Sequence, residues 1–323
     1  MKKKTFRTIF EELNGVPLEM PNNQNFDEDN FSLTDEIDHS ILMHKDAHFG
    51  GDFDIMISYY EDDAHVGIDP NFDLSRIEYL YKVEKESGNN LAAAMLTVSE
   101  MEQVARCRAA YTKLKEIYEL DEMGQTIPYL ISDLILTEEE EPIDAINALV
   151  LRGARVVPDL INIIKSDEAY DPLFPGYGYA PYLAAICLGK IKDTSALPAL
   201  FEMLRRDAIF DEDALLDVFL DFAEPAKNYL LERLTGRPLT NDNEHAAFAL
   251  SAFSYDSLVA EAALFQLQKG DVQKRIMLSN YLLCLCDPLS NSPHKESFTA
   301  LAIDPTVPEE IRSQIKDIVH DWH

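Results

Sequence analysis

A proline-led apolar motif recurs along the second half of this chain and constrains its fold more than any other feature. Ile127-Pro128-Tyr129-Leu130 returns as Val157-Pro158-Asp159-Leu160 and again as Leu197-Pro198-Ala199-Leu200. A further copy, with its proline shifted, carries Leu230, Leu231 and Leu234. The leading leucine therefore falls at residues 130, 160, 200 and 230, a 30-residue period with ten extra residues in its middle interval.

Each period predicts a pair of helices. Before the second motif, Ala145, Ile146 and Leu149 have helical spacing, and similar residues precede the third motif. One helical hairpin cannot bury its own apolar face, so several hairpins must stack side by side. The sequence therefore predicts an all-α fold, an α-solenoid or superhelix of helical hairpins.

A helical N-terminal module is predicted ahead of the repeats. Capping residues and apolar spacing indicate helices over 35–48, 52–60, 73–87 and 90–120, with Asp52 and Asp73 as N-caps. The alternation from Phe53 to Tyr59 also permits a strand, but its helical context favours a helix. We therefore expect a flexible segment over 1–33, the helical module over 34–122, and the repeats with C-terminal capping helices over 123–323.

Charge and cysteine usage exclude several classes of function. The chain has 58 acidic and 28 basic side chains, a formal charge of −30, so it repels nucleic acid and anionic membranes. This charge fits either simple solubility or a positively charged partner, which is a basic protein or a cation. The four cysteines have no zinc or disulfide pattern, which favours a cytoplasmic protein. Residues 5–13 form a short amphipathic segment instead of a signal-peptide core, and no stretch is apolar enough to span a bilayer.

One unit of the repeat resembles a known family. The pattern Ala184-Ala185-x-x-Leu188-Gly189-x-Ile191-x-Asp193-x-x-Ala196-Leu197-Pro198 is similar to the short bacterial HEAT repeat, the type also found in phycobilisome lyases. The resemblance covers about residues 126–268 and implies a HEAT-like α-solenoid, most often a scaffold for other proteins. Some HEAT-like proteins are enzymes. The His-Glu dipeptides of deoxyhypusine hydroxylases and the basic face of DNA glycosylases are both missing here.

An aromatic insertion accounts for the longer middle interval. Residues 170–182 carry Tyr170, Phe174, Tyr177, Tyr179 and Tyr182 among prolines and glycines that bar a helix. Aromatic loops are enriched at protein interfaces, so these five residues are candidate partner contacts. The same rings could instead pack down and seal the widened gap between two hairpins.

A histidine pair provides the leading candidate metal site, since the acidic run over 137–142 is better explained as the start of a helix. His44 and His48 lie one helical turn apart, and the turn at Gly50-Gly51 could bring Asp52 back toward them. Such a set can bind zinc or iron, although the pair also continues an apolar stripe and could simply pack in the core. The leading interpretation is a non-catalytic scaffold that binds a protein partner and needs no cofactor. The alternatives are a metal-binding protein or metal-dependent enzyme, and one wall of a larger assembly.

Overall fold

The computed structural model describes residues 36–61, 68–121, 123–137, 142–206 and 212–322. These residues form helices and no β-strand, which confirms the predicted all-α class. The chain divides into two compact units, Met1–Ala184 and Ala185–His323. The predicted boundary at residue 122 lies inside the first unit, and the predicted flexible segment over 1–33 lies outside the described residues.

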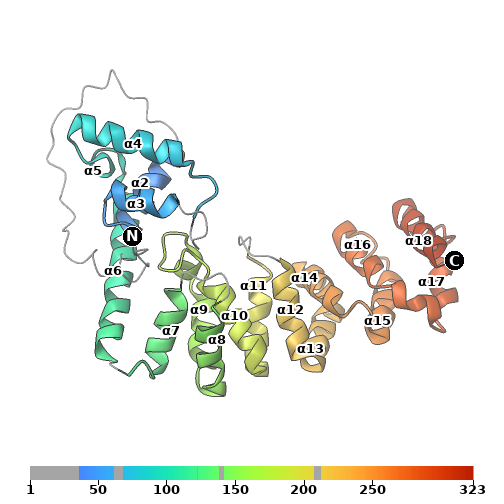
Figure 1. The fold of residues 1–323 in the computed structure, drawn as a ribbon. Helices are drawn as coiled ribbons and strands as arrows, with labels where there is room; N and C mark the ends of the chain where they lie inside the picture. Colours follow the sequence, from blue (N-terminus) through green and yellow to red (C-terminus); the bar gives the residue numbers. More distant parts are fainter. Residues whose placement is uncertain (1–35, 62–67, 122, 138–141, 207–211, 323) are drawn as a thin grey trace. The chain divides into compact units, whose positions relative to one another are not determined.

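The first helices are α2 (Glu36–His48), α3 (Phe53–Tyr60) and α4 (Leu74–Ser87) (Figure 1), and capping residues bound α3 and α4. The Asp52 carboxylate accepts a hydrogen bond from the Asp54 backbone N–H at 2.8 Å, which starts α3 as a helix and excludes the strand. The Asp73 carboxylate starts α4 in the same way, and Gly88 ends it in the left-handed conformation.

The prediction of one helix over residues 90–120 is wrong, because the helix is interrupted at Leu96, whose backbone is extended. A short helix, α5 (Leu91–Met95), is followed by the long helix α6 (Val98–Leu120). Thr97 caps α6 through a capping box in which the Glu100 carboxylate accepts from the Thr97 backbone N–H at 2.6 Å. These polar groups satisfy N–H groups that a continuous helix would have bonded internally.

Two buried charged side chains of this module, Lys45 and Asp38, each have a partner of opposite charge. Lys45 is fully buried, and its ammonium donates to both carboxylate oxygens of Glu84, at 2.9 and 3.2 Å. Arg76 forms a bidentate pair with the buried carboxylate of Asp38, at 2.5 and 2.6 Å. Ile41, Met56 and Leu80 belong to the core of the same module, so the fully buried Lys45 and Asp38 depend on their partners for stability. The partners themselves reach the surface, since the Arg76 side chain is 36% exposed and that of Glu84 is 21% exposed.

The repeat helices begin at the prolines that the sequence marks. In the first unit these are α7 (Ile127–Ile135), α8 (Ile143–Val150) and α9 (Val157–Lys165), followed by the short helix η2 (Asp167–Tyr170) and the start of α10 (Ala180–Ile191). Pro128 and Pro158 stand in the first turns of α7 and α9, where the missing N–H costs no hydrogen bond. The predicted loop is therefore shorter than 170–182, since residues 180–182 already belong to α10.

The second unit continues the alternation of helix and turn. Its helices after α10 are α11 (Leu197–Met203), α12 (Glu212–Phe222), α13 (Glu224–Thr235), α14 (Asn241–Ala249), α15 (Ser257–Leu267), α16 (Ile276–Cys284), α17 (Lys295–Leu301) and α18 (Glu309–Asp321). Ala246 and Ala247 of α14 are fully buried, and α14 packs against both α13 and α16. At the end, the Trp322 indole N–H donates to Asp287 at 3.0 Å while its ring lies 5.3 Å from that of Phe298.

No helix in the described ranges is both long enough and apolar enough to cross a membrane.

Candidate functional site

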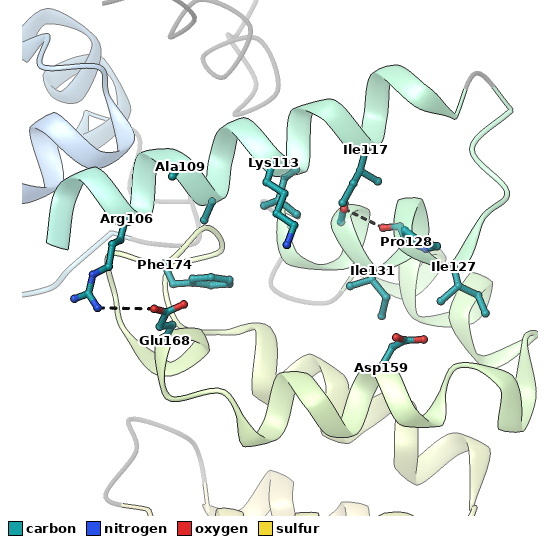
Figure 2. A pocket seen from close by; sticks show the side chains of 13 residues that line it. Arg106, Ala109, Lys113, Ile117, Ile127, Pro128, Ile131, Asp159, Glu168 and Phe174 are labelled. Carbon is teal, nitrogen blue, oxygen red and sulfur yellow. Dashed lines mark hydrogen bonds and ion pairs between the residues drawn. The ribbon is translucent and has the colours of Figure 1, made fainter. Parts of the chain in front are cut away.

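A groove lies between α6, α7 and α9 in the first unit, and described residues provide its walls. Its volume is about 690 Å³, within the range of roughly 300–1,000 Å³ typical of ligand pockets. We call it the α6–α9 groove (Figure 2). The wall from α6 consists of residues at helical spacing, Arg106, Ala109, Ala110, Lys113, Leu114 and Ile117.

The opposite side of the groove comes from the repeats and from the aromatic insertion. Ile127 and Ile131 of α7 and Asp159 of α9 line it, and the Phe174 ring projects into the space between α6 and α9 (Figure 2). Below them Leu114 and Ile135 form a small apolar core. The floor is therefore apolar and is built from three helices and one loop.

Charges of opposite sign occupy the two rims. Arg106 and Lys113 belong to α6, whereas Asp159 and Glu168 belong to α9 and η2. Arg106 and Glu168 approach to 3.9 Å across the end of the groove, and both side chains are 68% exposed. An exposed pair of this kind contributes little to stability. The groove therefore presents a basic wall and an acidic wall on either side of an apolar floor.

The Gly176-Tyr177-Gly178 turn explains the unusual composition of the insertion. All three residues have positive φ, at 86°, 56° and 81°. A Cβ on Gly176 would lie 2.1 Å from the Ile135 carbonyl oxygen, and one on Gly178 would lie 3.0 Å from that of Tyr170. Only glycine fits so close to another backbone in this conformation. The turn therefore lies directly against α7, and the Tyr177 side chain points into the core.

Tyr177 is a core residue, which corrects its prediction as a partner contact. Its side chain is 8% exposed and stacks on His48, with ring centroids 4.3 Å apart. Burial raises the pKa of Tyr177 well above 10, and the neighbouring hydroxyls of Tyr59 and Tyr111 add to this effect. Tyr177 thus packs inward, as the alternative predicts, but against His48 of α2 and not between two repeat hairpins.

The other predicted contacts are divided between packing and exposure. The Tyr170 hydroxyl donates to the Ile164 carbonyl at 2.9 Å, and Tyr182 is half-buried in the first turn of α10. Phe174 is half-buried and faces the groove, and Tyr179 is 46% exposed. Phe174 and Tyr179 therefore keep surface that a partner could reach.

The histidine pair lies in the core. His44 and His48 have ring centroids 5.2 Å apart, and His44 meets Phe72 edge-on at 4.9 Å. One His48 nitrogen, Nδ1, lies 2.5 Å from the Tyr111 hydroxyl, and the other, Nε2, lies 3.3 Å from the Pro172 carbonyl. Burial lowers the pKa of His44 to about 4 and that of His48 well below 6.5, so both imidazoles are neutral at pH 7.

The three predicted metal ligands are not brought together. Asp52 is exposed and its carboxylate caps α3, while His44 and His48 face the core. Within the described ranges, no group of three His, Cys, Asp or Glu side chains is placed to hold a metal ion. His44 and His48 thus pack in the core, and the described residues provide no set of three ligands for the predicted metal site.

Buried thiols give no nucleophile either. Burial raises the pKa of Cys107 and of Cys187 to about 12, so both stay protonated at neutral pH.

Comparison with protein-family models, with curated proteins and with solved structures finds no match to this chain. The candidate site therefore stands on its own geometry. Sequence reasoning identified Phe174 but missed the wall that α6 provides. The spacing of Arg106, Lys113 and Ile117 marks one helix face, but a single sequence does not say which element that face meets.

Proposed function

We propose that this protein is a non-catalytic scaffold that binds a protein partner in the α6–α9 groove. The observation that carries the proposal is an apolar groove of about 690 Å³ whose two rims have opposite charge. This combination fits an amphipathic helix laid into a groove, a common mode of peptide recognition. The groove residues include no histidine or cysteine, and the hydroxyl of Ser132 there donates to the Pro128 carbonyl at 2.9 Å.

We also propose that the hairpins stack as a HEAT-like α-solenoid. Support comes from the 30-residue period and from the first-turn prolines Pro128, Pro158, Pro198 and Pro225 of α7, α9, α11 and α13. Within each unit, helices adjacent in sequence also pack together, as α7 does with α8 and α13 with α14. Nearest-neighbour packing of this kind is the rule in solenoids.

The partner in this proposal has a basic surface outside the segment that enters the groove. The formal charge of −30 attracts such a surface and repels nucleic acid and anionic lipid. The dispersed cysteines, of which Cys107, Cys187 and Cys286 are buried as free thiols, fit the cytoplasm.

Quantitative affinity purification from the native cell tests the proposal. The wild type and the Phe174→Asp variant serve as baits, because aspartate places a charge on the apolar floor. Tyr255→Asp is the matched control, since Tyr255 is 93% exposed and belongs to the second unit. The proposal requires a protein that the wild type and Tyr255→Asp capture equally and that Phe174→Asp loses. Equal capture by all three folded baits rules out the groove as the binding site.

A further inference from the structure

The α6–α9 groove matches one segment of the chain itself. Residues 5–13 carry Phe6, Ile9, Phe10 and Leu13, at the i, i+3, i+4 and i+7 spacing of an amphipathic helix. We propose that this segment docks in the α6–α9 groove of its own chain and must be displaced before a partner binds. This goes beyond the proposed scaffold role, because self-docking requires no partner.

Size supports this occupant. The groove follows α6 from Arg106 to Ile117, about 16 Å at 1.5 Å per residue. Nine helical residues are about 13 Å long, so residues 5–13 fit along it. The groove floor is apolar at Ile127, Ile131 and Phe174, and the segment brings two phenylalanines and two branched aliphatic side chains to cover it.

Charge complementarity supports it on both walls. At 3.6 residues per turn, Arg7 and Glu12 fall on opposite flanks of the apolar stripe. The groove has Lys113 on its α6 wall and Asp159 on its α9 wall (Figure 2). Only one of the two helix directions places Glu12 beside Lys113 and Arg7 beside Asp159. The Arg7 and Glu12 pairings therefore favour one direction, while Glu11 lies on the Arg7 flank and farther from the apolar stripe.

The connection is long enough for docking within one chain. Residues 14–35 separate the segment from α2, and these 22 residues can span up to about 70 Å. A tethered segment meets its site at an effective concentration on the order of 1 mM, so even weak intrinsic affinity fills the groove.

Photo-crosslinking of the full-length chain tests the proposal. A benzoylphenylalanine probe is placed at position 174 in the groove, and the same probe at position 255 is the matched control. Irradiation at position 174 is expected to give a monomer-sized product in which mass spectrometry finds residues 5–13 attached. Crosslinks that avoid residues 5–13, or that join them only in a dimer-sized product, overturn docking within one chain.

Two variants of the probe-bearing chain sharpen the result. Phe10→Asp is expected to lower the crosslink yield about tenfold, since it removes one of the apolar side chains with which the segment covers the groove floor. Glu12→Lys is expected to lower the yield several-fold at low salt, and Lys113→Glu in the same chain is expected to restore it. A crosslink yield that Phe10→Asp leaves unchanged contradicts the proposal. So does a Glu12→Lys/Lys113→Glu double variant whose yield is no higher than that of Glu12→Lys alone. The crosslinking experiment contains no partner protein. A negative crosslinking result therefore rules out self-docking without bearing on whether a partner binds in the groove.

Discussion

The imidazole of His48 lies parallel to the phenol of Tyr177, with centroids 4.3 Å apart and planes 23° from each other. His48 belongs to α2 and Tyr177 to the insertion before α10, so residues 129 positions apart share one stack. Tyr111 of α6 meets the same imidazole edge-on, at 5.6 Å between ring centroids. The stack therefore ties the insertion to the N-terminal helices and fixes the loop that supplies Phe174.

Replacing Tyr177 is expected to destabilise the protein strongly. Tyr177→Ala leaves a cavity beside His48, and comparable aromatic truncations cost about 3–5 kcal/mol in free energy of unfolding. Tyr179→Ala is the matched control, because that ring is 46% exposed and its loss is expected to cost less than about 0.5 kcal/mol. Urea unfolding measures both. Similar losses in the two variants contradict the assignment of Tyr177 to the core.

Acid is expected to destabilise the protein through the same stack. Burial lowers the pKa of His44 to about 4, an effect that Asp69 and Asp171 partly offset, and it lowers the pKa of His48 well below 6.5. The unfolded chain protonates histidine near 6.5, so below that pH it binds more protons than the folded chain. The stability is complete above pH 6.5 and is lost as the pH falls toward 4. His44 alone accounts for about 2 kcal/mol between pH 7 and pH 5.

The measurement is the free energy of unfolding at several pH values for the wild type and for His44→Gln. The glutamine variant lacks one buried imidazole, so its stability is expected to change less over the same interval. Parallel curves for the two proteins contradict a neutral, buried His44.

The close approach of the insertion to α7 is expected to make Gly176 irreplaceable. Gly176→Ala places a Cβ 2.1 Å from the Ile135 carbonyl oxygen and also requires a left-handed alanine, so a loss above about 3 kcal/mol is expected. Gly153→Ala is the control. Gly153 has φ of 58° but no atom within 4 Å of its added Cβ, so the backbone cost alone, about 1 kcal/mol, applies. Thermal unfolding that shifts equally for both contradicts the contact.

Local chemistry made much of the fold predictable. Asp52 and Asp73 predicted where α3 and α4 start, and Pro128 and Pro158 of the repeat motif stand in the first turns of α7 and α9. Thr97 and Glu100 were a readable capping box too, yet the absence of Pro and Gly between 90 and 120 hid the break before α6. Caps depend on a few neighbouring residues, and a single sequence shows those directly.

The site was far less predictable, because its contacts join distant segments. Tyr177 and Tyr179 have the same residue type and lie two positions apart, but one is buried and the other exposed. What separates them is the positive φ at residues 176–178 and the position of Ile135, and neither follows from composition. The histidine pair shows the same limit, since helical spacing places His44 and His48 on one face but does not say that this face meets Tyr177 and Phe72.

Removing residues 1–13 is expected to strengthen partner binding if the chain occupies its own groove. A partner that enters the α6–α9 groove must displace the docked segment, so its apparent affinity for the full-length chain is reduced by the fraction of chains whose groove is free. Isothermal calorimetry with the captured partner is expected to give a dissociation constant several-fold lower for the shortened chain. Phe10→Asp in the full-length chain is expected to reproduce that gain, because it weakens docking without shortening the chain. Phe174→Asp is expected to lose binding in both lengths. An unchanged dissociation constant in the shortened chain means that the segment and the partner do not compete.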